Sequence, residues 1–155
     1  MVEQLSVFLE NTTGRLAELT RALGDAGLNM RALMVADTSE FGVVRVICDR
    51  PHAAADVLEN AGFSASLTEV IAVEVPDRPG GLADVLEALG HAGINVEYAY
   101  CFVEPSADAA IDIFRVDDPV RAARVLAEAG IQLANADALY LPDSRPLSDI
   151  VDTGV

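Results

Sequence analysis

The feature that most constrains this chain is an internal duplication. The segment NTTGRLAELTRALGDAGLNM begins at Asn11 and DRPGGLADVLEALGHAGINV begins at Asp77; at this offset of 66 they are identical at 9 of 20 positions. DRPHAAADVLENAGF from Asp49 and DDPVRAARVLAEAGI from Asp117 match at an offset of 68. The second copy has therefore gained two residues, which we place in the turn from Glu104 to Ala110 because turns tolerate insertions. The sequence predicts one fold built twice.

Each copy has the pattern strand, helix, strand, strand, helix, strand. In the first copy Leu5, Val7 and Leu9 alternate with polar residues, which predicts a half-buried strand. Apolar residues at helical spacing follow in both copies: Leu16, Leu19, Leu23 and Ala26, then Leu82, Val85, Leu86 and Leu89. The β-rich runs that come next are residues 31–36 and 43–49, with counterparts at 97–103 and 110–116.

The ends of the helices are marked by proline and glycine. A second helix in each copy is predicted to begin near Pro51 or Pro119, because proline suits the first helical position, and Asp118 is a suitable N-cap. All four predicted helices end in Ala-Gly followed by an apolar residue, starting at Ala26, Ala61, Ala92 and Ala129. This ending is typical of a left-handed glycine C-cap with a hydrophobic contact.

These elements predict an α+β protein of two tandem ferredoxin-like βαββαβ units, each an antiparallel sheet with its helices on one face. We expect the units at residues 1–70 and 71–141, followed by a mobile C-terminal tail at 142–155. The segment from Ser66 to Val75 contains no Gly or Pro, so the last strand of the first copy and the first strand of the second are expected to share one strand. The segment ALYLPD near the end resembles AVEVPD in the middle of the chain.

Charge excludes several classes of function. The formal net charge is -15, which argues against binding to nucleic acid or to an anionic membrane. All ten basic residues are arginine, so a Schiff-base lysine and a lysine-containing phosphate loop are both excluded.

The composition also predicts where the protein is found. No apolar run is long enough to cross a membrane, and the chain starts directly with a strand-like pattern, so we expect no signal peptide and a cytoplasmic protein. Cys48 and Cys101 lie in apolar runs and are interpreted as buried free thiols. His52 and His91 are far apart, with no ligand spacing around them, so we predict no metal site and no cofactor.

The loop and turn that flank the first helix of each copy resemble those of the ACT domain family. The second copy carries Asp-Arg-Pro-Gly-Gly-Leu before the helix and Gly-Ile-Asn-Val after it; the first carries Asn-Thr-Thr-Gly-Arg-Leu and Gly-Leu-Asn. The resemblance covers residues 3–141 and is greatest to small bacterial proteins that consist of two ACT units. It implies a regulatory, non-catalytic module that binds a small ligand, most often an amino acid, where two units meet.

Carried over residue by residue, the resemblance implies two sets of ligand contacts. The set in the first copy is Asn11, Thr12, Thr13, Gly14, Arg15, Leu16, Leu28, Asn29 and Met30. The set in the second copy is Asp77, Arg78, Pro79, Gly80, Gly81, Leu82, Ile94, Asn95 and Val96.

The chemistry of these residues agrees with an amino-acid ligand. Backbone N–H groups of Gly80, Gly81 and Leu82 at a helix start can receive a carboxylate. Carbonyls, Asp77 and the side-chain oxygen of Asn95 can accept from an ammonium group. Because Gly80 and Asn95 lie at opposite ends of one helix, a second unit is expected to complete the site, within the chain or across a homodimer.

Simpler interpretations stay open for the same residues. The glycines can serve only as turns and helix caps, Arg78 can be a solvated surface arginine, and Asn29 and Asn95 can hydrogen-bond the backbone of their own turn. A second hypothesis is an interaction subunit that controls a partner enzyme by edge-strand pairing, with or without a ligand. An enzyme requires a nucleophile with a base, paired acids or a metal set, and the sequence contains no such pattern.

Overall fold

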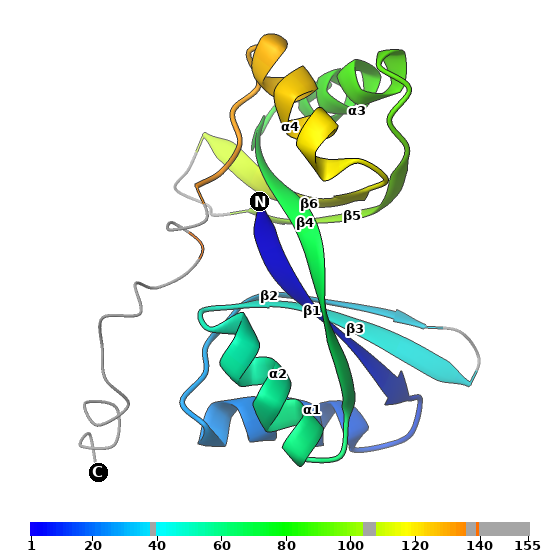
Figure 1. The fold of residues 1–155 in the computed structure, drawn as a ribbon, viewed down its shortest axis with the longest axis vertical. Coiled ribbons are helices and arrows are strands. Elements are labelled where there is room, and N and C mark those ends of the chain that lie inside the picture. Colours follow the sequence, from blue (N-terminus) through cyan, green and yellow to red (C-terminus); the bar gives the residue numbers. More distant parts are fainter. Residues whose placement is uncertain (38–39, 104–107, 136–138, 140–155) are drawn as a thin grey trace. The chain divides into compact units, whose positions relative to one another are not determined.

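The structure is a computed structural model that describes residues 1–37, 40–103, 108–135 and 139. Figure 1 shows its helices and strands. The helices are α1 (Arg15–Asp25), α2 (Pro51–Asn60), α3 (Gly81–His91) and α4 (Pro119–Glu128). The strands are β1 (Val2–Glu10), β2 (Met30–Asp37), β3 (Phe41–Cys48), β4 (Ser64–Pro76), β5 (Val96–Val103) and β6 (Ala109–Val116).

The chain divides into two compact units, which we call the N-terminal unit (Glu3–Thr68) and the C-terminal unit (Glu69–Ala136, with Met1 and Val2). Their boundary lies inside β4, which is one continuous strand of 13 residues. The shared strand expected around residues 66–75 is therefore confirmed. The unit boundary expected after residue 70 stays a prediction.

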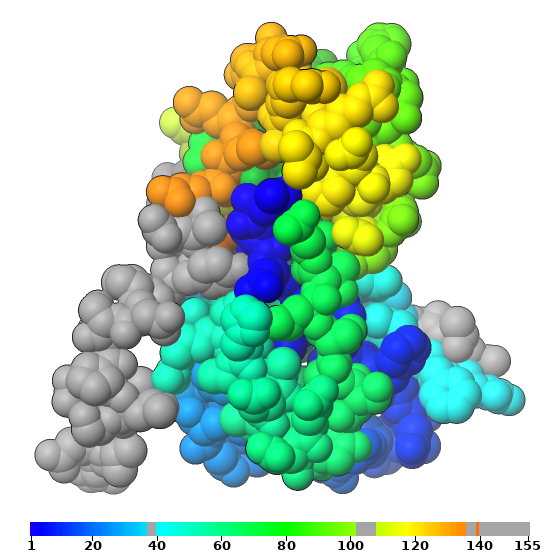
Figure 2. All heavy atoms as spheres, viewed as in Figure 1, coloured from blue at the N-terminus to red at the C-terminus, as the bar shows by residue number. Residues whose placement is uncertain are grey.

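The strands of the N-terminal unit follow the order β2-β3-β1-β4, and the assigned register pairs β3 antiparallel with both β1 and β2. Ser6 on β1 and Thr68 on β4 share a hydrogen bond of 2.9 Å between their hydroxyl oxygens. Figure 2 shows atoms of β1 in blue lying alongside those of β4 in green. Both helices of this unit cover one face of its strands (Figure 1).

The C-terminal unit repeats this plan. Its strands follow the order β4-β6-β5, with antiparallel pairing. On the other edge of β4, Leu133 forms a bridge with Val73, and Ala134 N–H donates to the carbonyl oxygen of Ala72 at 2.8 Å. Residues 132–134 thus take the position that β4 occupies in the N-terminal unit. The predicted α+β class of two ferredoxin-like units is confirmed.

The predicted helix ends are confirmed by backbone geometry. The glycines that follow the four helices, Gly27, Gly62, Gly93 and Gly130, all have a φ between 69° and 89°. The N-terminal caps differ between copies. Asp118 accepts a hydrogen bond from the N–H of Arg121 at the start of α4, as predicted, whereas Arg50 makes no side-chain cap on α2.

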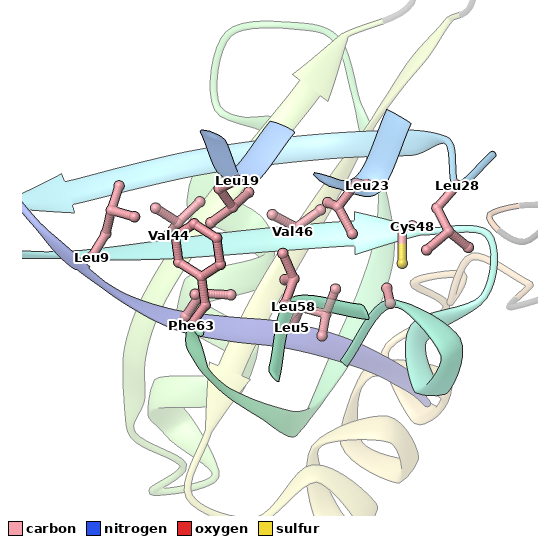
Figure 3. Close-up of a cluster of buried hydrophobic side chains, with 12 residues drawn as sticks. Leu5, Leu9, Leu19, Leu23, Leu28, Val44, Val46, Cys48, Leu58 and Phe63 are labelled. Carbon is pink, nitrogen blue, oxygen red and sulfur yellow. The ribbon is translucent and has the colours of Figure 1, made fainter. Parts of the chain in front are cut away.

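The core of each unit is a layer between its helices and its strands. In the N-terminal unit, Leu19 and Leu23 of α1 meet Val44 and Val46 of β3, with Leu58 of α2 beside them (Figure 3). In the C-terminal unit the corresponding layer contains Val85 and Leu89 of α3 with Phe114 of β6.

The apolar stripe predicted for α3 is wider than its buried face. Val85 and Leu89 are fully or almost fully buried, but Leu82 is 45% exposed and Leu86 is 39% exposed. Leu82 lies in the first turn and Leu86 lies on the flank of the stripe, so neither faces the strands directly. Leu16, the counterpart of Leu82 in α1, is also exposed.

Two predictions about individual segments have different outcomes. The two-residue gain lies between β5 and β6, because residues 38–40 separate β2 from β3 whereas residues 104–108 separate β5 from β6. The prediction that Cys101 is buried is wrong. Cys101 is exposed because it lies on β5, which is at one end of the strand order. The predicted tail at 142–155, and ALYLPD apart from Leu139, lie outside the described residues.

Candidate functional site

The loop before α3 is a tight glycine turn. Asp77 N–H donates to the carbonyl oxygen of Asp108 at 3.1 Å, and Arg78 N–H donates to that of Pro76 at 2.8 Å. Gly80 has a φ of 86°, in the left-handed region that favours glycine. A Cβ atom on Gly81 would collide with the carbonyl oxygen of Pro76, so no larger residue fits without a backbone shift.

An arginine folds back over this helix start. The guanidinium of Arg78 donates to the Asp84 carboxylate at 2.6 Å and to the carbonyl oxygen of Pro79 at 3.2 Å. The Arg78 side chain is 56% exposed, so the ion pair is solvated. The sequence-based interpretation of Arg78 as a surface arginine was therefore incomplete, because the side chain holds the first turn of α3.

The loop before α1 reaches a similar arrangement with different residues. Gly14 has a φ of 90°, and Arg15 donates to the Glu18 carboxylate at 2.6 Å. The Arg15 guanidinium carbon also lies 4.4 Å from the centroid of the Phe63 ring, a cation–π contact. Glu18 and Asp84 occupy aligned positions of the two copies, but their arginine partners do not. Each helix start therefore has a guanidinium beside it.

Both helix starts lack a side-chain cap. Neither Gly14 nor Gly80 can supply one, and no side chain accepts a cap hydrogen bond at α1 or α3. Within the described residues, the N–H groups of Leu16 and Ala17 have no hydrogen-bond acceptor, nor have those of Leu82 and Ala83. Gly81 N–H is occupied, because it donates to the carbonyl oxygen of Arg78 at 3.0 Å. Of the N–H groups expected to bind an anion at the start of α3, that of Gly81 is thus occupied, whereas that of Leu82 is available together with that of Ala83.

The turns after α1 and α3 are held through the backbone of their asparagines. Asn29 N–H donates to the Asp49 carboxylate and Asn95 N–H to that of Asp117, each at 3.2 Å. The amide side chains of Asn29 and Asn95 are exposed and make no hydrogen bond within the described residues. The simpler interpretation, in which these side chains bond their own turn, is therefore not what the structure has.

An arginine also supports the C-terminal end of each of these helices. Arg50 donates to the carbonyl oxygen of Gly27 at 3.0 Å, and Arg121 donates to that of Ala92. Positive charge at this end is favourable because helix carbonyls point outward there. Sequence reasoning did not identify Arg50, Arg121, Asp49 or Asp117 as support for the asparagine turns, although the aligned Asp49 and Asp117 were a usable signal.

Within each unit the two parts of the predicted site are far apart. The glycine loop precedes α3 and Asn95 follows it, and the 11 residues of α3 span roughly 16 Å. The same separation holds for Gly14 and Asn29 across α1. One unit therefore brings together its loop residues, and separately its turn residues, but not the two groups.

A cross-strand pair near the α3 loop combines a thiol with a carboxylate. Cys101 on β5 lies opposite Asp112 on β6, and their side chains share a hydrogen bond. Burial raises the pKa of Asp112, and the hydrogen bond to Cys101 lowers it in part. Partial burial and then the Asp112 charge raise the pKa of Cys101. Cys48, in contrast, lies in the core of the N-terminal unit, where burial raises the pKa of its thiol to about 11.

One hollow among the described residues borders the uncapped start of α1. This hollow of about 530 Å³ lies along α1, and its lining includes Ala17, Glu18, Thr20 and Arg21. The described part of the chain has no group of three His, Cys, Asp or Glu side chains placed to hold a metal ion. None of the described helices combines the length and apolar character needed to span a bilayer.

Comparisons with known proteins agree with the fold. A protein from Bacteroides thetaiotaomicron, BT0572, is 35% identical in sequence with a TM-score of 0.85, and the match covers 90% of this chain and 96% of that one. The regulatory subunit of aspartate kinase from Thermus thermophilus, in its ligand-free form, is 18% identical with a TM-score of 0.62, covering 82% and 91% of the two chains. The Thermus flavus counterpart is 18% identical with a TM-score of 0.60, covering 83% and 92%. No curated protein matches the sequence.

The family assignment rests on the sequence as well as on the fold. The family model of the ACT domain pair matches residues 1–141 of the 155-residue chain. Two ferredoxin-like units, each with a glycine loop before its first helix and a Gly-x-Asn turn after it, account for that match. The chain belongs to the ACT domain family and is an ACT domain pair.

Proposed function

We propose that this protein is a non-catalytic regulatory protein that binds a free amino acid where ACT units of two chains meet in a homodimer. The observation that carries the proposal is the pair of uncapped helix starts, at α1 and α3, each with free N–H groups and a nearby guanidinium. An N-cap Ser, Thr, Asp or Asn would accept from these N–H groups through its side chain, which Gly14 and Gly80 cannot do, so each start can receive a carboxylate from outside the chain.

The ligand class follows from the two ends of each helix. A carboxylate can accept from the N–H groups of Leu82 and Ala83, and the exposed amide of Asn95 offers an oxygen that accepts from an ammonium group. An α-amino acid carries both charged groups. The net charge of -15 disfavours a multiply charged phosphate ligand.

The proposed stoichiometry follows from helix length. A free amino acid is much shorter than α3, whose length of roughly 16 Å separates Gly80 from Asn95. The carboxylate end of one unit and the Gly-x-Asn turn of a unit in the partner chain can enclose the ligand together. The regulatory subunits of aspartate kinase, which share this fold, support a role in the control of amino-acid metabolism.

A thermal-shift screen of the twenty amino acids at millimolar concentration tests this function. An amino acid at 100 times its Kd stabilises the folded state by about 2.7 kcal/mol, which raises Tm by roughly 5 °C or more at this chain length. The corresponding amine without a carboxylate serves as the control for each hit. If all twenty amino acids leave Tm unchanged, the proposed function is wrong.

A second candidate function is control of a partner enzyme by direct contact. β2 is at one end of the strand order and exposes Leu33 (41%) and Val35 (43%), which suits pairing with a partner strand. Co-purification from native cells, repeated with a Leu33→Glu variant, distinguishes it. Loss of a co-purifying enzyme in the variant supports contact through β2, and recovery of the protein without any enzyme contradicts it.

A further inference from the structure

Asp112 is the one charged residue that is buried among the residues the structure describes. It is 5% exposed. It pairs across the sheet with Val73 on β4 and with Cys101 on β5. Val73 belongs to the core packed by α3 and α4, so Asp112 lies on the helix-covered face of the sheet. A carboxylate at such a position is costly unless it is well hydrogen-bonded.

The aligned residues of the N-terminal unit show which side chains can fill the positions of Cys101 and Asp112 in the fold. In the N-terminal unit the aligned cross-strand pair is Val35 and Val44, and Val44 is fully buried. The same place in the fold is thus filled by two valines in one copy and by a thiol and a carboxylate in the other. Packing therefore does not explain Asp112.

Asp112 has unused hydrogen-bonding capacity. Its partner in the described residues is the Cys101 thiol, which is a weak donor, whereas a carboxylate can accept about four hydrogen bonds. Cys101 is exposed and lies on the edge strand β5. A donor that displaces the thiol can therefore reach the pair from solvent.

The pair lies close to the uncapped start of α3. A Cβ on Gly81 would come within 3.5 Å of the Val75 side chain, so the helix start packs on the end of β4. Val75 pairs with Ala110, which is two residues from Asp112 on the same face, a separation of about 7 Å. Asp77 of the loop is near enough to Cys101 to act on the pKa of its thiol.

We propose that Asp112 accepts one N–H of the ammonium group of the amino acid whose carboxylate lies at the start of α3, while the Gly-x-Asn turn of the partner chain accepts another, and that the Cys101 thiol gives up its hydrogen bond when the ligand binds. This proposal rests on the proposed function and adds that the C-terminal unit holds the ligand. The N-terminal unit has Val35 and Val44 at the aligned cross-strand position and so has no carboxylate there.

Calorimetric titration of Asp112→Asn tests the role of the carboxylate. With the amino acid that gives the largest thermal shift, we expect affinity to fall about 10- to 100-fold, as for the loss of one charge-assisted hydrogen bond. Glu87→Gln removes a negative charge from the exposed face of α3 and should keep affinity within about 2-fold of wild type. The ligand's analogue without the amino group should bind wild type and Asp112→Asn equally.

The outcomes separate this proposal from the proposed function. If wild type binds an amino acid and Asp112→Asn binds it equally well, the role of Asp112 is wrong while amino-acid binding stands. If wild type binds none of the twenty amino acids, both proposals are overturned.

The reactivity of Cys101 in the wild-type chain gives a second test that needs no variant. A thiol reagent followed by mass spectrometry should label exposed Cys101 and leave buried Cys48 unlabelled as an internal control. A saturating amino acid should slow Cys101 labelling several-fold, because the ligand covers the pair. An unchanged labelling rate at saturation places the ligand elsewhere and overturns the proposal.

Discussion

At the scale of single residues, two adjacent glycines at the start of α3 have different physical roles. Gly80 is required by its backbone, because its φ of 86° is strained for other residues. Gly81 is required by space, because a Cβ would collide with the carbonyl oxygen of Pro76. The sequence predicted a turn here. It could not show that Gly80 is required by its backbone conformation and Gly81 by lack of space, because both positions are simply glycine.

Gly81→Ala should destabilise the protein by about 1–3 kcal/mol, as expected for overpacking against a backbone atom. Gly90→Ala, in the same helix, is the matched control, because its Cβ would meet no atom within 4 Å. That variant should gain about 0.5–1 kcal/mol from helix propensity. Chemical denaturation of both variants measures the difference, and a Gly81→Ala variant as stable as wild type would contradict the packing of α3 on Pro76.

Asp112→Asn should raise stability at neutral pH by on the order of 1 kcal/mol, because it removes a buried charge. Burial raises the folded-state pKa of Asp112 above its unfolded value, so the folded protein favours the protonated carboxyl. The cost of the carboxylate is complete above the raised pKa and disappears as pH falls below the unfolded value. Two other ionisable groups lie near Asp112: the thiol of Cys101 and, next to that thiol, the carboxylate of Asp77.

Calorimetric Tm values of wild type and Asp112→Asn from pH 7 down to about pH 3, below the ordinary pKa of an aspartate, check this prediction. The advantage of the variant should shrink as pH falls through the raised pKa of Asp112 towards its unfolded value. An Asp112→Asn variant that is less stable than wild type at pH 7 would show that the buried carboxylate is satisfied in the unliganded protein.

At the scale of helices and strands, local signals predicted most of what the structure has. Glycine C-caps, the proline starts of α2 and α4 and the shared strand β4 all depend on short stretches of chain, so the sequence contains them. The burial of side chains where helices pack on strands was less predictable. Leu82 and Leu86 fit the apolar stripe of α3, but their exposure depends on how much of the helix the strands cover.

The candidate site was predicted in part for the same reason. The loop and turn residues are contiguous in sequence and form the local structures expected, whereas Asp112 comes from a strand far along the chain. From the alternating pattern of β6 alone, Asp112 would be predicted to face solvent. Only the register with Val73 and Cys101 places it on the covered face.

Asp118→Ala should lower stability by about 1 kcal/mol through loss of the α4 N-cap, in which Asp118 accepts from the Arg121 N–H at 3.0 Å. Asp56→Ala, in α2, removes a similar charge without removing a cap and should stay within about 0.5 kcal/mol of wild type. Urea denaturation of the two variants compares them. Equal stability of Asp118→Ala and wild type would show that the cap contributes nothing in solution.

At the scale of the whole molecule, the duplication determines both what is shared and what differs. The two units share their order of elements, their glycine C-caps and their uncapped α1 and α3 starts. They differ in the arginines beside those starts and in the pair at Cys101 and Asp112. Because the two units differ in these residues at equivalent positions, we expect one ligand site per chain rather than two.

Raising the NaCl concentration from 10 mM to 150 mM should raise Tm by roughly 2–4 °C, equivalent to about 1 kcal/mol at this chain length. The chain carries a net charge of -15, and salt screens the repulsion that this charge causes in the compact state. Sucrose at matched osmolality controls for effects unrelated to charge. A Tm that falls with salt would show that specific ion pairs outweigh the net repulsion.

The most direct test of the central claim is a calorimetric titration of the wild-type chain with the amino acid that gives the largest thermal shift. We expect saturable binding of one amino acid per chain, and weaker binding of the analogue that lacks the amino group. Absence of saturable binding by each of the twenty amino acids would contradict an amino-acid-binding role for this ACT domain pair.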